Sequence, residues 1–114
     1  MLFDDMEFGP YDKAEHRART AYELYEDGKM KQALDELEAA LEINPSNASW
    51  HFTKALTLDA LSQFEEAIRE FELALQFNPE DTEILNSLAV DYTRTGLYDL
   101  AIETFEHIEQ LDPE

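Results

Sequence analysis

The stretch EINPSNASW at residues 42–50 interrupts a helix-like run of Ala, Leu and Glu with a single proline. The same junction returns as QFNPEDTEI at residues 76–84 and as QLDPE at residues 110–114. Because proline pushes the residue before it out of helical geometry, each junction predicts the end of a helix. The prolines of the three junctions are Pro45, Pro79 and Pro113, at an interval of 34 residues. The sequence therefore predicts a structural unit of constant length.

Superposing the junctions divides the chain into three units at residues 14–47, 48–81 and 82–114, preceded by an acidic and aromatic segment at residues 1–13. In the second half of each unit, apolar residues recur at spacings of three and four, which places them on one face of a helix. The first halves are also helical in pattern. They end at Gly28, Ser62 and Gly96. Each unit is thus predicted to be a helix, a tight turn and a second, antiparallel helix.

These shared positions resemble the tetratricopeptide-repeat pattern of small and large apolar residues. The first unit supplies Ala21, Leu24, Ala33, Leu37, Ala40 and Pro45; the second Ala55, Leu58, Ala67, Phe71, Ala74 and Pro79; the third Ala89, Tyr92, Ala101, Phe105 and Pro113. The tryptophan that the family carries early in the first helix falls on Arg17, His51 and Leu85, and Ile108 replaces a small residue. The resemblance covers residues 14–113. It implies an all-α fold, a right-handed α-solenoid of three antiparallel helix-turn-helix repeats.

Composition agrees with a helical domain. The 114 residues are 44% apolar, with only 3 glycines and 4 prolines. There is no cysteine, and no apolar run approaches the ~20 residues that a membrane helix needs. The first residues lack the basic and apolar regions of a secretory signal. We therefore expect a cytoplasmic protein without membrane insertion.

The chain is strongly acidic. It carries 27 Asp and Glu against 8 Lys and Arg, a formal net charge of -19. Such a charge repels phosphate backbones and anionic membranes, so nucleic acid is not expected as a partner. The charge itself fits a solvated helical surface, adaptation to high salt, or attraction of a basic partner.

No motif in the sequence predicts catalysis, a metal or a cofactor. The histidines His16, His51 and His107 fall one in each unit without the spacing of metal ligands, and we expect them to be partly exposed. There is no glycine-rich phosphate loop and no serine in the context of a nucleophile elbow. The sequence predicts a protein that is not an enzyme and has no cofactor.

In the family, the first helices of successive repeats line a concave groove that accepts extended peptides or helices. Carried over by position, the groove residues are Tyr22, Tyr25, Phe52, Leu56, Asn86, Val90 and Arg94. The acidic rim of this groove is Glu15, Glu26, Asp59 and Glu83. The resemblance thus implies a protein or peptide ligand that is apolar and carries Lys or Arg. In the alternative interpretation, Tyr22, Tyr25 and Leu56 pack between repeats and the groove is unused.

Some members of the family hold a C-terminal carboxylate with a clamp of Lys, Asn and Arg. The corresponding positions of the first two repeats are Ala18, Tyr22 and Thr53, and only Asn86 and Ser87 offer polar contacts in the third. The clamp is therefore missing, which disfavours binding of acidic chaperone tails.

Both ends of the chain leave alternatives open. Residues 1–13 contain Leu2, Phe3, Met6 and Phe8 among acids, as expected of a disordered tail or of a segment that caps a repeat or occupies a groove. The outward side of residues 98–111 is expected to expose apolar residues of the last repeat. We expect a following element in a longer protein, or self-association through this uncapped repeat. The leading function is an interaction scaffold; the alternatives are homotypic assembly and an accessory domain of a larger protein.

Overall fold

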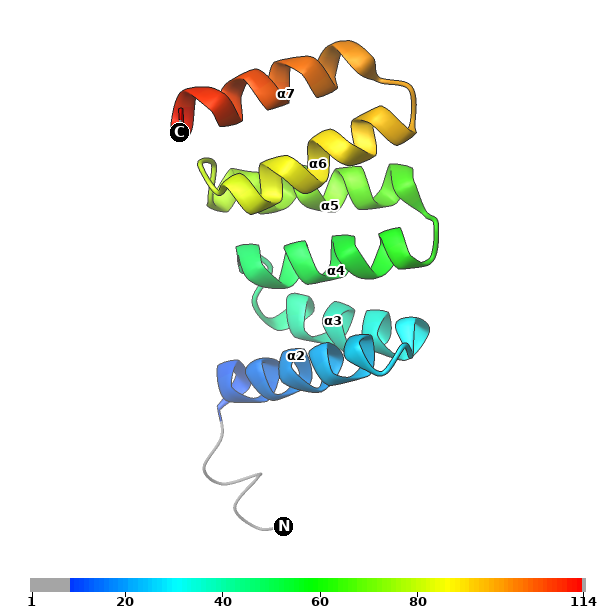
Figure 1. Ribbon diagram of the computed structural model, residues 1–114. Helices are drawn as coiled ribbons and strands as arrows, with labels where there is room; N and C mark the ends of the chain where they lie inside the picture. The colour runs from blue at the N-terminus through cyan, green and yellow to red at the C-terminus, as the bar shows by residue number, and fades with distance from the viewer. Residues whose placement is uncertain (1–8, 114) are drawn as a thin grey trace.

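The computed structural model describes residues 9–113, and this part of the chain folds into helices without a strand. The helices are α2 (Pro10–Glu26), α3 (Met30–Ile43), α4 (Ala48–Ala60), α5 (Phe64–Phe77), α6 (Thr82–Arg94) and α7 (Tyr98–Leu111). They stack in chain order into an elongated body of 53 × 26 × 22 Å, with α2 and α7 at opposite ends (Figure 1). The all-α prediction is confirmed.

Each predicted unit is an antiparallel helix pair. Within the repeats α2 packs on α3, α4 on α5 and α6 on α7, while α3 with α4 and α5 with α6 join neighbouring repeats. Alanines on both helices of a pair are buried, among them Ala21, Ala33, Ala55 and Ala67. Because these side chains are small, the paired helix axes can approach closely.

The turns inside the repeats share one backbone geometry. Gly28 and Gly96 have φ of 81°, and Ser62 at the equivalent place has φ of 62°. In the second repeat the amide of Gln63 donates to the carbonyl of Leu58 at 2.9 Å, and the other two turns contain the matching bond. This bond closes the helix C-terminus, and glycine adopts the required left-handed conformation at the lowest cost. Ser62 therefore occupies a conformation that an L-residue rarely adopts.

The joints between repeats behave as their sequences predict. Asn44 before Pro45 leaves helical geometry, with φ of -134° and ψ of 83°. The side chain of Asn47 then accepts a hydrogen bond from the Trp50 amide at 3.0 Å. In the next joint Asp81 accepts from the amides of residues 83 and 84. These caps satisfy amides that the first turn of a helix cannot pair internally.

The large residue that fills each repeat has a different environment at the end of the stack. Leu37 is 1% exposed and Phe71 is 0% exposed, whereas Phe105 at the same repeat position is 43% exposed. Ile102 on the same helix is also exposed. The outward side of α7 is thus apolar and open to solvent within residues 9–113, as the sequence predicts for this helix.

The first helix begins earlier than the repeat boundary. Pro10 is its first residue, where proline's missing amide costs nothing, and Gly9 is the N-cap. The Gly9 amide donates to Asp12 Oδ2 at 3.3 Å. The Gly-Pro break after the N-terminal segment is therefore the start of α2. The interpretations of Leu2, Phe3, Met6 and Phe8 lie outside the described residues.

The expectation that all three histidines are partly exposed is wrong for His51, which is 7% exposed. Its Nδ1 lies 2.8 Å from Glu70 Oε1, and its Nε2 lies 2.7 Å from the carbonyl oxygen of Pro45. Each ring nitrogen is thus within hydrogen-bond distance of an oxygen of another element. His51 therefore ties α4 to α5 and to the joint that precedes α4.

Candidate functional site

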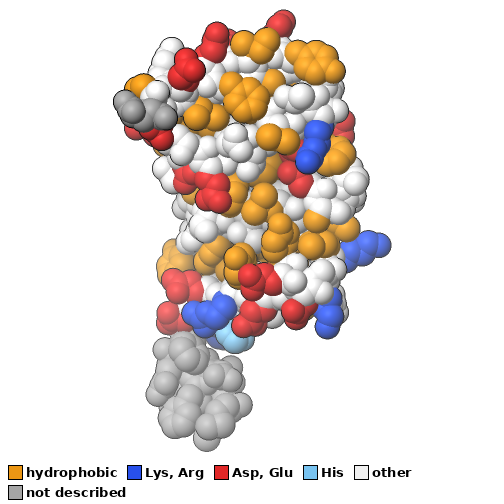
Figure 2. Space-filling view, viewed as in Figure 1, with side chains coloured by type: hydrophobic (Ala, Val, Ile, Leu, Met, Phe, Trp, Pro, Cys, Tyr) orange, Lys and Arg blue, Asp and Glu red, His pale blue; other side chains and the backbone are white. Residues whose placement is uncertain are grey.

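The first helices of the three repeats share one face of the molecule. In Figure 1 α2 lies in front of α3 and α6 in front of α5, so this face, the first-helix face, is turned toward the viewer. Figure 2 shows that hydrophobic side chains gather across it, flanked by acidic ones. The first-helix face is thus mixed, apolar and acidic, in character.

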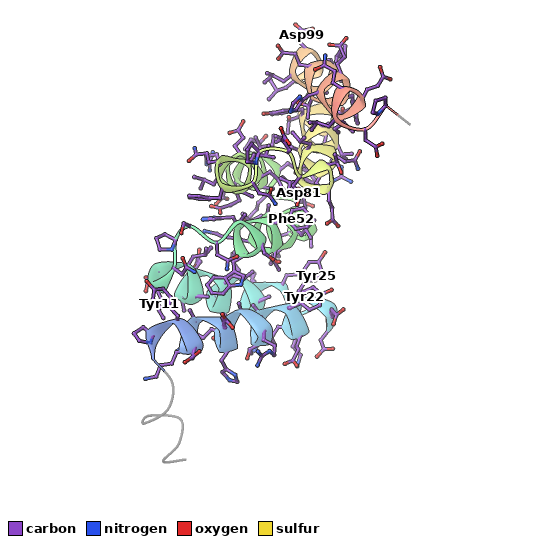
Figure 3. All side chains as sticks on the ribbon, turned by 90° about the vertical axis from the view of Figure 1, so that its left-hand side faces the viewer. Tyr11, Tyr22, Tyr25, Phe52, Asp81 and Asp99 are labelled. Atoms are coloured by element: carbon purple, nitrogen blue, oxygen red, sulfur yellow. The ribbon has the colours of Figure 1, made fainter. Side chains whose placement is uncertain are left out.

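An aromatic pair stands at the end of α2. The rings of Tyr22 and Tyr25 stack with centroids 6.4 Å apart and planes 21° from parallel. Tyr22 remains 52% exposed and Tyr25 is partly buried. Figure 3 shows Tyr22 and Tyr25 on the same side of the stack as Phe52, whereas Tyr11 lies near the start of α2. An exposed stacked pair offers a rigid apolar surface to a ligand.

Two further predicted groove residues, Phe52 and Leu56, are partly buried against the core and partly open to solvent. Phe52 lies 5.8 Å from the Phe71 ring, and Phe52 and Leu56 pack against the buried cluster of the second and third repeats while keeping part of their surface open. These contacts show packing between helices for both side chains. The surface that stays open is what a ligand could use.

A hollow of about 400 Å³ lies between α2 and α4. Its lining brings together the predicted residues Glu15 and Tyr22 with others of α2, α3, α4 and the joint between repeats: Ala18, Arg19, Leu37, Asn47, Ser49, Trp50 and Thr53. Sequence reasoning missed Arg19 and Trp50 as parts of the site. The displaced Trp50 was a usable signal, because a large ring outside its family position must pack somewhere else.

A second hollow, of about 620 Å³, lies on the α2–α3 side and has mainly charged walls. Arg17 and Glu36, both in its lining, form an ion pair at 2.7 Å. The wall of this hollow lacks the apolar floor that Leu37 and Trp50 give the other one. We therefore place the candidate site at the first-helix face.

The third repeat adds a more polar end to this face. Asn86 is exposed and Val90 is partly buried on α6. Arg94 is held on both sides: its Nη1 lies 3.3 Å from Asp91 Oδ1, and its guanidinium lies over the Phe64 ring at 5.3 Å. Arg94 is thus committed to contacts with α5 and α6.

The four rim residues are not alike. Glu15, Glu26 and Glu83 are exposed, but Asp59 is partly buried. Burial first, and then the hydrogen bond and negative charge of Asp91, raise the pKa of Asp59 to about 8, although Arg94 acts in the opposite direction. Asp59 is therefore mainly protonated at neutral pH and does not act as a steering charge. The sequence could not show this, since the partner belongs to the next repeat.

No group of three His, Cys, Asp or Glu within residues 9–113 could hold a metal ion, and no helix in this range is long and apolar enough to cross a membrane. The Tyr92 hydroxyl donates to Glu72 Oε2 at 2.7 Å, and burial together with this bond raises the pKa of Tyr92. This bond joins α6 to α5, which is a structural role.

Stacked helix pairs with one open face define the class of helical-repeat scaffolds. The family described as the Psidin N-terminal TPR repeats region matches residues 15–114. The chain belongs to this family of tetratricopeptide repeats. A search of curated proteins found no match.

Solved structures show the same fold. A mutant of MamA superposes with a TM-score of 0.82 at 27% identity, over 89% of this chain and 74% of that one. The TPR domain of Arabidopsis OM64 gives 0.86 at 18% identity, over 93% and 88%. The first TPR of Spaghetti (RPAP3), bound to the HSP90 peptide SRMEEVD, gives 0.85 at 19% identity, over 91% and 82%. The predicted tetratricopeptide-repeat fold is confirmed.

Proposed function

We propose that this protein is a non-enzymatic protein-interaction scaffold that binds a peptide or an amphipathic helix on its first-helix face. The observation that carries the proposal is the stacked Tyr22 and Tyr25 pair with Tyr22 half exposed, beside a hollow that reaches Leu37 and Trp50. Large rings that are rigid and open to solvent are typical anchors of a binding surface.

The ligand that fits this face is apolar and carries Lys or Arg. Tyr22, Phe52 and Val90 supply apolar surface, and the exposed carboxylates Glu15, Glu26 and Glu83 surround it. A net charge of -19 adds long-range attraction for a basic partner. Charge of this kind raises the association rate and selects the partner more than it adds affinity.

The neighbour RPAP3 binds a peptide with two adjacent glutamates and a C-terminal aspartate. The present face differs in chemistry, because Ala18, Tyr22 and Thr53 stand where a carboxylate clamp needs basic or amide groups. We therefore propose that this chain uses the same kind of scaffold for a ligand of opposite charge.

The outward side of α7 favours a second candidate, in which the chain self-associates or packs against a further part of a larger protein. Tyr98, Ile102 and Phe105, at spacings of four and three, are exposed large apolar residues on one side of this helix. Exposed apolar patches of this kind often mark interaction surfaces. Concentration-dependent sedimentation of the wild type and of Ile102→Lys separates this candidate from a monomeric scaffold.

A peptide-display selection on the purified protein tests the leading candidate. We expect the enriched peptides to combine aromatic or aliphatic residues with Lys or Arg, and to shift amide resonances of α2, α4 and α6. Enrichment of acidic C-terminal peptides, or shifts confined to α3, α5 and α7, would contradict the proposal.

A further inference from the structure

Two carboxyl groups meet at the junction of the second and third repeats. Asp59 comes from the end of α4, and Asp91, whose side chain is 0% exposed, comes from α6. Two of their oxygens, Asp59 Oδ1 and Asp91 Oδ2, are buried without a donor among the described residues. The other oxygen of Asp91 accepts from Arg94. A pair of buried acceptors facing one another is unfavourable unless something positive stands between them.

One proton meets this requirement. A carboxylic acid donates to a neighbouring carboxylate, so a shared proton pairs both groups at once and removes their repulsion. Burial of Asp59 and the hydrogen bond and charge of Asp91 raise the pKa of Asp59 to about 8, against the opposing effect of Arg94. The pair therefore holds one proton at neutral pH.

The surrounding charges are otherwise engaged. Asp91 and Arg94 of α6 are the charged groups that act on Asp59, and α5 presents the Phe64 ring to Arg94. Lys54, also on α4, lies 3.4 Å from Glu70 of α5 and 3.8 Å from Glu38 of α3. Lys54 is thus held by the opposite side of its helix and does not neutralise the carboxyl pair.

We propose that the proton shared by Asp59 and Asp91 is a pH-sensitive latch that holds α4 to α6 and sets the spacing of the first-helix face at this junction. When the proton is lost, two buried negative charges face each other across the junction and favour its separation. A change in the spacing of the first-helix face would also change how tightly that face binds its ligand. This consequence rests on the proposed function, whereas the latch itself does not.

The direction of the pH dependence follows from linkage. The pKa of Asp59 is higher in the folded protein than its ordinary value of 3.8. The native state therefore binds this proton more tightly than the unfolded chain does. The stabilisation is fully present below about pH 4 and is lost as the pH rises through about 8.

The variant Asp59→Asn tests the latch, because an asparagine amide donates to Asp91 at every pH. We expect the melting temperature of the wild type to fall relative to that of D59N as the pH rises from about 4 to 8, with D59N higher by at least about 4 °C at the upper end. Asp35→Asn, at an exposed position of α3, is the matched control and should follow the wild type. Parallel curves for all three proteins would overturn the proposal.

Carbon-13 spectra of the aspartate carboxyl groups in the wild type give a readout that depends on no variant. We expect one aspartate signal to titrate near pH 8. If every aspartate signal titrates below about pH 6, the latch is refuted. A signal near pH 8 together with a peptide affinity that is unchanged between about pH 7 and 9 would retain the latch and reject its control of binding.

Discussion

Replacing Phe71 and Phe105 by alanine, one at a time, compares the same repeat position in two environments. Phe71 is 0% exposed and lies 5.8 Å from the Phe52 ring, inside a cluster formed by α4, α5, α6 and α7. Phe71→Ala removes a buried ring and leaves a cavity, so its expected cost is about 3–5 kcal/mol. This is a large share of the ~5–15 kcal/mol by which a folded domain is stable.

Phe105→Ala removes a ring that is already 43% exposed. Because fully burying a large apolar side chain contributes about 1.5–3 kcal/mol, the expected cost is about 1–1.5 kcal/mol and little cavity remains. Urea unfolding followed by far-ultraviolet circular dichroism measures both values. Equal losses from the two substitutions would refute the reasoning, since they would mean that α7 is covered on its outward side or that the second repeat is not the centre of the core.

Three smaller changes test the joints and turns. His51→Ala should cost about 1.5–3 kcal/mol because it removes charge-assisted bonds to Glu70 and the Pro45 carbonyl, whereas exposed His16→Ala should stay within about 0.5 kcal/mol. Ser62→Gly should stabilise the chain by up to about 1 kcal/mol in thermal unfolding, since φ of 62° strains an L-residue; a loss of stability would contradict this. Asp81→Ala should cost about 1 kcal/mol by removing the N-cap of α6, with faster amide exchange at residues 83 and 84; unchanged exchange there would count against the cap.

Much of the fold could be predicted because its determinants are local. The prolines, the residues of the turns and the caps act within a few positions of themselves; the prolines and turns recur in all three repeats, and the side-chain caps at both joints. Gly28, Ser62 and Gly96 therefore end helices where the sequence indicates, and Asn47 and Asp81 cap the helices that follow. Repetition therefore supplies each local rule more than once, three times for the turns and twice for the caps.

The environment of His51 could have been predicted from the repeats but not from its own neighbours. The same two repeat positions hold Arg17 with Glu36 in the first repeat and His51 with Glu70 in the second, and each pair forms an ion-pair contact. In the third repeat these positions hold Leu85 and Thr104. Oppositely charged or hydrogen-bonding residues at the same two positions of successive repeats indicate a contact between the two helices of a repeat. A search for the spacing of metal ligands does not detect such a contact.

The candidate site was less predictable because its properties depend on side chains from different repeats. Asp59 has the sequence context of an exposed rim residue, yet Asp91, which lies 32 positions later, changes its charge state. Similarly, Arg94 is expected in the groove but stacks on Phe64 of the preceding repeat. Such contacts depend on how repeats rotate against each other, which one repeat's pattern does not encode.

The affinity of a selected peptide for a first-helix-face variant tests the central claim most directly. Tyr22→Ala combined with Phe52→Leu removes the exposed ring while keeping apolar volume beside Phe71, and Tyr98→Ala is the matched control at an exposed aromatic residue of α7. We expect the dissociation constant, measured by calorimetry, to rise at least about 10-fold in the double variant and to be unchanged in the control. An unchanged affinity in the double variant, or a loss confined to Tyr98→Ala, would contradict binding at the first-helix face.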